Sequence, residues 1–123
     1  MKLTKLTPVL YTNDLKKSVD FYVEILNFSS SSLDVDSTIA FVRFGDIELM
    51  LSLPNDHVPF TQSNFTGSFY FQTLNVMEIW ESIKDKASIC YPIEDFEYGL
   101  REFAIYDNNG YLFRLDRNYR YFS

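Results

Sequence analysis

The sequence contains few of the residues that form disulfides, metal sites and nucleic-acid-binding surfaces. Cys90 is the only cysteine among 123 residues, which excludes an internal disulfide and a cysteine-based zinc site within one chain. His57 is the only histidine, and we expect it in an exposed loop. Basic residues are scarce too, since 11 of them against 17 acidic residues give a net charge of −6. This balance argues against nucleic acid as a partner, because binding to phosphates requires a basic surface.

Long apolar runs are also missing. No run approaches the roughly 20 apolar residues that span a bilayer. The first residues, MKLTKLTPVL, lack the long apolar stretch of a signal peptide. We therefore expect a cytoplasmic protein without a membrane partner.

Aromatic residues, in contrast, are abundant, with 12 Phe, 9 Tyr and one Trp. Most should belong to the core, because aromatic side chains supply large buried areas in small domains. Some of the excess could line a cavity for a flat or apolar ligand. If the acidic balance serves a ligand, it favours a cationic one.

The first half of the chain predicts a strand, a helix and three further strands. The first strand covers residues 7–12, and a helix over 13–27 carries apolar residues at the spacing of one helix face. An edge strand follows over 29–36. Strands over 39–44 and 47–53 join at Gly45-Asp46, a two-residue hairpin signal that pairs Arg43 with Glu48. The apolar stripe of the helix consists of Leu15, Val19, Tyr22, Val23 and Leu26.

The second half repeats this order, with a strand over 67–73, a helix over 75–87, a short strand over 88–93 and a hairpin around the turn sequence DNNG at 107–110. Thr7 and Ser68 hold matching places, as do Glu48 and Arg114. The sequence therefore predicts an α+β fold of two βαβββ modules, at about 1–55 and 66–123, joined by the loop 53–66 within a single domain over residues 1–123.

Two phrases carry a resemblance to a known family. NDLKKSVDFYVEILNF resembles the pattern D-L-x-x-S-x-x-F-Y-x-x-x-L-G-F, and YGLREFAIYDNNGYLFRL is similar to Y-G-x-R-E-F-x-x-x-D-P-D-G-x-x-x-x-F. Both patterns are typical of the vicinal oxygen chelate superfamily, which includes glyoxalases, dioxygenases and bleomycin-resistance-type proteins. The resemblance implies two modules that each curl a mixed sheet around a cavity, commonly within a homodimer.

Enzymes of that superfamily hold a divalent metal with four residues, and the resemblance assigns their places here to Thr7, Glu48, Ser68 and Arg114. Only Glu48 is a usual ligand. A guanidinium has no lone pair to donate and stays protonated, so Arg114 repels a divalent ion. We therefore expect no metal and no cofactor, and favour a protein that is not an enzyme.

Strand alternation identifies the side chains that face the predicted cavity. Arg43, Glu48 and Arg114 could form an internal salt-bridge cluster in place of the metal, or bind an anionic or zwitterionic group. The other residues could line a ligand pocket or fill the space completely. The candidate ligand-binding residues are Thr7, Tyr11, Arg43, Glu48, Met50, Ser68, Tyr70, Gln72, Phe103, Leu112 and Arg114.

Three functions remain open. The preferred one is a dimeric small-molecule-binding protein that resembles the bleomycin-resistance type and binds or sequesters an aromatic or cationic ligand without catalysis. The second is a metal-dependent lyase or dioxygenase of the superfamily. The third is a degenerate member that is retained for its structure or for a protein partner.

The loss of metal ligands can be tested by restoring one of them. Arg114→Glu should not create metal binding, because Thr7 and Ser68 remain weak ligands. Titration with zinc measures this, and a nanomolar affinity in the variant would contradict the prediction.

Overall fold

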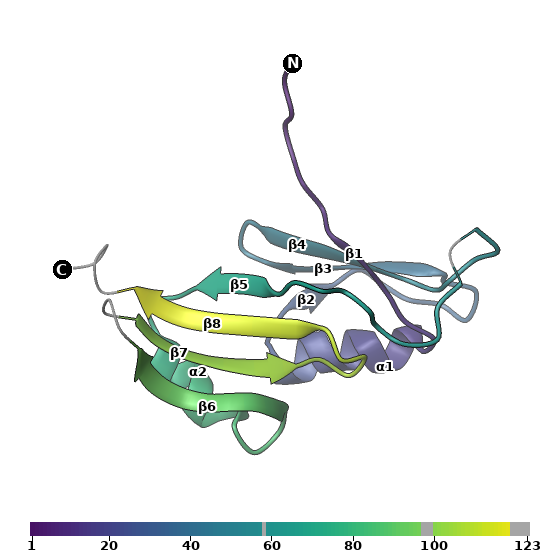
Figure 1. Cartoon of the computed structure of the whole chain (residues 1–123). Helices are drawn as coiled ribbons and strands as arrows, with labels where there is room; N and C mark the ends of the chain where they lie inside the picture. Colours follow the sequence, from purple (N-terminus) through teal and green to yellow (C-terminus); the bar gives the residue numbers. More distant parts are fainter. Residues whose placement is uncertain (58, 97–99, 119–123) are drawn as a thin grey trace. The chain divides into compact units, whose positions relative to one another are not determined.

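The computed structural model describes residues 1–57, 59–96 and 100–118. The chain divides into two compact units, Met1–Ser63 and Asn64–Ser123, and each contains one four-stranded mixed sheet with a helix beside it (Figure 1). This is the predicted α+β arrangement of two βαβββ modules. The boundary between the units lies inside the predicted connecting loop. Within the described residues, no helix has the length and apolar character needed to cross a membrane.

The first unit consists of β1 (Val9–Tyr11), α1 (Leu15–Asp20), η1 (Phe21–Ile25), β2 (Ser29–Ser30), β3 (Ile39–Phe44) and β4 (Ile47–Ser52). The strand order is β1-β4-β3-β2, with β1 parallel to β4 and the other pairs antiparallel. Gly45 has a φ of 58°, the left-handed conformation that a tight hairpin requires. The predicted pairing of Arg43 with Glu48 is confirmed.

The first helix changes its winding part-way. The Asp14 side chain caps its start by accepting a hydrogen bond from the Lys17 backbone N–H at 3.0 Å, and Asn27 follows its end with a φ of 61°. After Asp20 the chain continues as the π-helix η1, whose wider turn shifts the following side chains around the axis. The predicted apolar stripe is therefore wrong at Val23, which is exposed.

The second unit consists of β5 (Phe69–Gln72), α2 (Val76–Ile83), β6 (Ser88–Phe96), β7 (Leu100–Tyr106) and β8 (Leu112–Asn118). The strand order is β5-β8-β7-β6, again with one parallel pair, β5 and β8. β6 is longer than predicted, and its pairing with β7 shifts register on both sides of Tyr91. Asp107 closes the β7–β8 turn by accepting hydrogen bonds from the backbone N–H groups of Asn109 and Tyr111, at 2.8 and 2.9 Å.

One face of each sheet packs against its helix and forms the core. In the second unit, Trp80 of α2 lies against Phe103 of β7 with ring centroids 5.2 Å apart. Phe103 pairs across the strands with Leu115, and both are buried. The opposite face of this sheet carries polar side chains.

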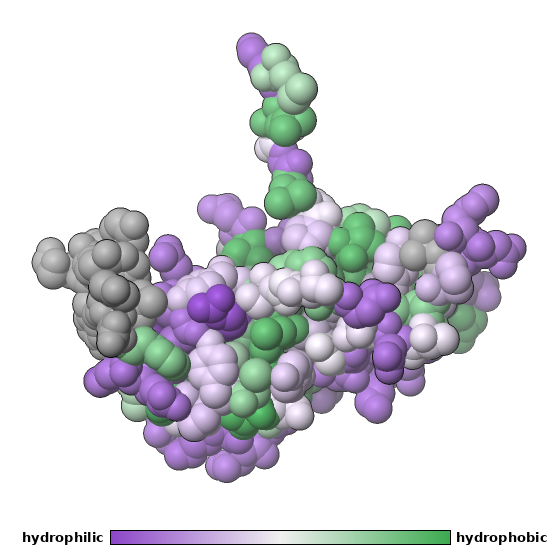
Figure 2. Space-filling model, in the orientation of Figure 1, coloured by the Kyte–Doolittle hydropathy of each residue, from purple (hydrophilic) through white to green (hydrophobic). Residues whose placement is uncertain are grey.

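Residues 1–8 precede β1 and carry both polar and apolar side chains, which Figure 2 shows along the N-terminal segment. Leu3 and Leu6 are each 86% exposed. The segment contacts β4 through the Pro8 carbonyl, which accepts a hydrogen bond from the Met50 backbone N–H at 2.9 Å. It therefore exposes apolar surface beside a fixed strand.

The same substitution at a buried and at an exposed phenylalanine tests this description of the core. Phe103→Ala should cost about 3–5 kcal/mol of unfolding free energy, because it leaves a cavity beneath α2. Phe44→Ala should cost about 1 kcal/mol or less, because Phe44 is 53% exposed at the hairpin. Urea unfolding measures both, and equal losses would show that Phe103 is not a core residue.

Candidate functional site

In the first unit, the sheet face opposite the helix carries the predicted polar group. Arg43 and Glu48 are direct cross-strand partners, and Met50 pairs with both Phe41 and Val9 on the same face. Alternation along β1 adds Tyr11 to this face. Thr7 precedes β1 and is half-buried. Extending the β1–β4 register by two residues places it beside Glu48.

Glu48 is bound by two cations. Lys5 donates a hydrogen bond from Nζ to Oε1 at 2.6 Å, and Arg43 donates from Nε to Oε2. The hydrogen bond from Lys5 is the main reason that the pKa of Glu48 lies below its usual value, and burial opposes it. Sequence reasoning missed Lys5, although alternation from Thr7 through a longer extended segment points to it. The negative charge of Glu48 is thus balanced by Lys5 and Arg43, which belong to the same unit.

In the second unit, several polar side chains on the sheet face opposite α2 lie around Arg114. Tyr70 of β5 and Ala104 of β7 pair with Arg114 on its two sides. Two residues further along β8, Asp116 pairs with Gln72 of β5 and with Glu102 of β7. Leu112 lies on the same face at the other end of β8. The registers therefore bring the predicted Tyr70, Gln72, Leu112 and Arg114 to one face, and their role in binding stays a prediction.

Glu102 is the centre of this face, and sequence reasoning missed it. Its carboxylate accepts hydrogen bonds from the hydroxyls of Tyr70 and Tyr91 and, at 3.2 Å, from Nε of Arg114. Burial alone would raise the pKa of Glu102, but these three donors outweigh it and the pKa is lowered. Burial also raises the pKa of Tyr91 to about 12. Both tyrosines consequently stay protonated as donors to a carboxylate.

Asp116 is the second buried carboxyl of this face. It is 1% exposed, and its Oδ1 has no hydrogen-bond partner among the described residues. Burial raises its pKa, and the neighbouring Glu102 carboxylate adds to this effect, while Tyr70 and Arg114 oppose it. The pKa values of these two opposed carboxyls are therefore shifted in opposite directions.

One prediction about this face is wrong. Phe103 was expected on the cavity side with Arg114, but its partner is Leu115 and its ring packs on Trp80, so it faces the helix. Ser68 precedes β5 and lies two residues before Tyr70, so alternation places it on the same face. Tyr70 is the residue of β5 that pairs with Arg114. Symmetric counting outward from the DNNG turn pairs Phe103 with Arg114, but the observed register is shifted by one residue, so that Tyr106 pairs with Leu112 and Glu102 with Asp116.

Comparison with known proteins agrees with this fold. The sequence model of the Glyoxalase/Bleomycin resistance protein/Dioxygenase superfamily matches residues 5–115. The chain belongs to this superfamily. The recognition made from the two sequence phrases is thereby confirmed. Comparison with curated proteins finds no match.

Several solved structures of the superfamily fold are similar to the chain. TioX from Micromonospora sp. ML1 is 22% identical with a TM-score of 0.74, over 94% of this chain and 98% of that one. A glyoxalase/bleomycin resistance protein/dioxygenase superfamily member from Sphaerobacter thermophilus DSM 20745 is 21% identical with a TM-score of 0.75, over 94% and 98%. A glyoxalase/bleomycin resistance protein/dioxygenase from Alicyclobacillus acidocaldarius is 16% identical with a TM-score of 0.72, over 93% and 90%. At these identities the likeness shows the fold alone.

The residues at the superfamily's metal-ligand places do not fit a divalent metal. Both carboxylate oxygens of Glu48 accept hydrogen bonds from cations. Arg114 and its neighbour Tyr70 supply a guanidinium and a protonated hydroxyl bound to Glu102, and neither is a usual ligand. In residues 1–57, 59–96 and 100–118, no three His, Cys, Asp or Glu side chains gather in a metal-binding group.

The difference between the two acids can be tested by titration. Asp116→Asn should raise the melting temperature at neutral pH, because the amide avoids the cost of ionising a buried carboxyl. The folded-state pKa of Asp116 is above its unfolded value of 3.8. The wild type therefore loses stability relative to the variant as the pH rises from there through the folded pKa, and melting curves between about pH 3 and pH 8 measure this.

Asp95→Asn is the matched control, with the opposite sign. The hydrogen bond from Arg101 lowers the pKa of Asp95, so the wild-type carboxylate stabilises the fold above the unfolded pKa and this contribution disappears on acidification. The variant should therefore be slightly less stable than wild type at neutral pH, because the pair is solvent-exposed. Equal pH dependence for both variants would refute the assignment for Asp116.

Proposed function

We propose that the protein binds a small aromatic molecule on the sheet face of the second unit that carries Arg114, without catalysing its conversion. The observation that carries the proposal is the position of Arg114. Its Cζ lies 4.2 Å from the centroid of the Tyr70 ring, while Glu102 fixes Nε from the buried side. A guanidinium stacked on an aromatic ring is a rigid, partly exposed platform for a flat ligand.

The exposed charges favour an acidic group on this ligand. On both faces the carboxylates are buried and the cations are not: the side chains of Glu48 and Glu102 are 8% and 4% exposed, whereas those of Arg43 and Arg114 are 62% and 37% exposed. A ligand that approaches either sheet therefore meets guanidinium groups first. The net charge of −6 remains an argument for a cationic ligand, but it acts over the whole molecule.

We also infer a homodimer, as the superfamily resemblance implies. Exposed apolar side chains in the N-terminal segment, Leu3 and Leu6, are the kind of surface that a second subunit covers. A dimer would be consistent with binding or sequestering a ligand rather than with a lone structural module.

Two probes of the same shape and opposite charge test the ligand class. We expect 4-hydroxybenzoate to raise the melting temperature more than 4-hydroxybenzylamine, because its carboxylate can pair with Arg114. Arg114→Gln should weaken the binding of 4-hydroxybenzoate about tenfold in isothermal titration. Lys16→Gln, which removes a cation from α1, should leave the affinity unchanged.

Two other results would support the two alternative functions. Stabilisation by Ni²⁺, Zn²⁺ or Mn²⁺ that disappears in Glu48→Gln would support a metal-dependent lyase or dioxygenase instead. No response to any organic probe or metal would support the degenerate structural member, in which Glu102 and its donors only satisfy one another.

A further inference from the structure

A bulge in the edge strand β6 changes which of its side chains lie on the sheet face opposite α2. Tyr91 pairs with Ala104. The next pair in the register joins Glu94 to Glu102, so three steps along β6 match two steps along β7. Cross-strand partners share a face, and the two partners on β7 are two residues apart, so Tyr91 and Glu94 lie on the same face. Phe96 lies there too, by alternation from Glu94.

The residues between these two pairs are Pro92 and Ile93. Proline lacks a backbone N–H and is confined within sheets to edge strands and bulges, and β6 is an edge strand of its sheet. Strict alternation from Tyr91 would turn Glu94 toward α2 instead. Bulges that re-aim a side chain are frequent beside functional sites. Tyr91, Glu94 and Phe96, named here the β6 cluster, are therefore a candidate site.

The two aromatic rings of the β6 cluster are held by contacts within the second unit. The Tyr91 hydroxyl donates a hydrogen bond to Glu102. The rings of Tyr91 and Phe96 meet edge to face, with centroids 5.8 Å apart and an interplanar angle of 74°. Phe96 is 39% exposed and Tyr91 is half-buried. The pair therefore presents preformed aromatic surface to solvent.

Glu94 adds an exposed carboxylate to these rings. Among residues 1–57, 59–96 and 100–118, none forms a hydrogen bond or an ion pair with its side chain. Glu102, its cross-strand partner, takes the hydrogen bond from Arg114 Nε at 3.2 Å. The carboxylate of Glu94 is thus the accessible charge on this part of the face.

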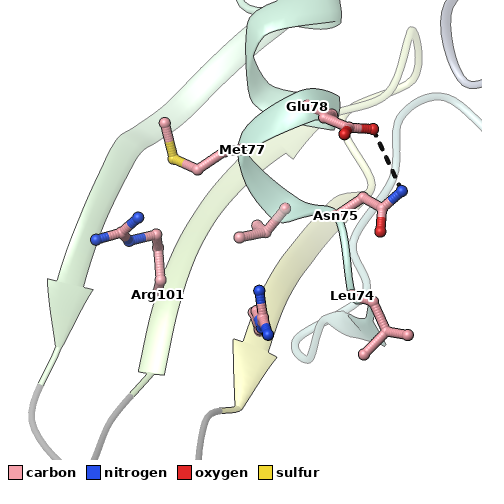
Figure 3. Close-up of a pocket in the computed structure, with 7 residues that line it drawn as sticks. Leu74, Asn75, Met77, Glu78 and Arg101 are labelled. Atoms are coloured by element: carbon pink, nitrogen blue, oxygen red, sulfur yellow. Dashed lines mark hydrogen bonds between the residues drawn. The ribbon is translucent and has the colours of Figure 1, made fainter. Parts of the chain in front are cut away.

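Asp95, which lies between Glu94 and Phe96 in the chain, serves the other face of the sheet. It accepts hydrogen bonds from Arg101 Nε at 2.6 Å and from a terminal nitrogen at 3.1 Å. Arg101 lines a pocket of about 220 Å³ at the start of α2, where Figure 3 shows it near Met77. The two adjacent acids are therefore divided: one is paired with an arginine beside α2, and the other lies with the exposed rings.

We propose that the β6 cluster binds the methylated ammonium group of a small organic cation. The ring faces of tyrosine and phenylalanine attract a cation through the ring quadrupole, and quaternary ammonium groups are recognised in this way. The Glu94 carboxylate adds a direct attraction between opposite charges. The guanidinium of Arg114 takes no part in this contact, so the inference does not depend on the function proposed above.

Two probes of the same shape test the site, choline and its neutral isostere 3,3-dimethyl-1-butanol, at constant ionic strength. We expect saturable changes in the ¹H–¹⁵N signals of Tyr91, Glu94 and Phe96 with choline. The alcohol should bind about tenfold more weakly, because it lacks the charge that the rings and the carboxylate attract. Equal affinities, or no saturable change at these three residues, would overturn the inference.

Variants separate the contributions of the carboxylate and the ring. Glu94→Gln keeps the shape of the side chain and should weaken choline binding about tenfold, and Phe96→Leu should weaken it by removing a ring. Glu81→Gln, the same change at an exposed carboxylate of α2, should leave the affinity unchanged. Dispersed spectra confirm that each variant is folded, and Glu94→Gln decides where Phe96→Leu is not. Choline binding to Glu94→Gln with wild-type affinity would contradict the proposal.

Crossed titrations distinguish this site from the one proposed for Arg114. Choline should still bind to Arg114→Gln, and 4-hydroxybenzoate should still bind to Glu94→Gln. Loss of choline binding in Arg114→Gln would overturn the separate cation site and leave the proposed function standing. Failure of 4-hydroxybenzoate to bind to the wild type, with choline bound at the β6 cluster, would overturn the proposed function alone.

Discussion

An ionised carboxylate that is buried on a sheet face needs hydrogen-bond donors, and the arrangement around Glu48 and Glu102 depends on this constraint. An ionised carboxylate loses its hydration on burial and needs hydrogen bonds and opposite charge in return. Glu102 obtains them from Tyr70, Tyr91 and Arg114, which belong to three other strands. The donors are thereby held in place, and the part of Arg114 that does not contact Glu102 is presented outward on the Tyr70 ring. In the first unit, the hydrogen bonds to Glu48 come from two cations, Lys5 and Arg43.

The same constraint acts on the pKa values of the two opposed acids. Glu102 and Asp116 are cross-strand partners, so two full negative charges would repel each other at short range. The three donors gather on Glu102, which lowers its pKa, while burial raises the pKa of Asp116. Donor placement thus shifts the pKa values of the two carboxyls in opposite directions.

The sequence was sufficient for the repeat, the register of the β3–β4 hairpin and most of the face assignments, because these follow from local turn chemistry and from a side-chain period of two. It was insufficient on β7, where four consecutive residues, from Glu102 to Ile105, are all buried. A strand buried on both faces has no polar alternation to follow, and Phe103 was therefore placed on the wrong side. The three donors to Glu102, Tyr70, Tyr91 and Arg114, lie 32, 11 and 12 residues away in the chain, and only the fold shows that they converge. The exposure of Val23 results from a π-helical turn, which the amino-acid composition does not predict.

The alternation of β8 also explains how an acidic chain can present cationic sites. Successive residues of this strand point to opposite faces, so Arg114 serves the face with the buried acids and Arg117 serves the face beside α2. Most acidic residues are elsewhere on exposed turns and helix surfaces, where water screens them. A ligand at short range responds to the nearest charges and only weakly to the sum over the molecule. The net charge of −6 therefore does not by itself exclude an anionic ligand at the Arg114 face.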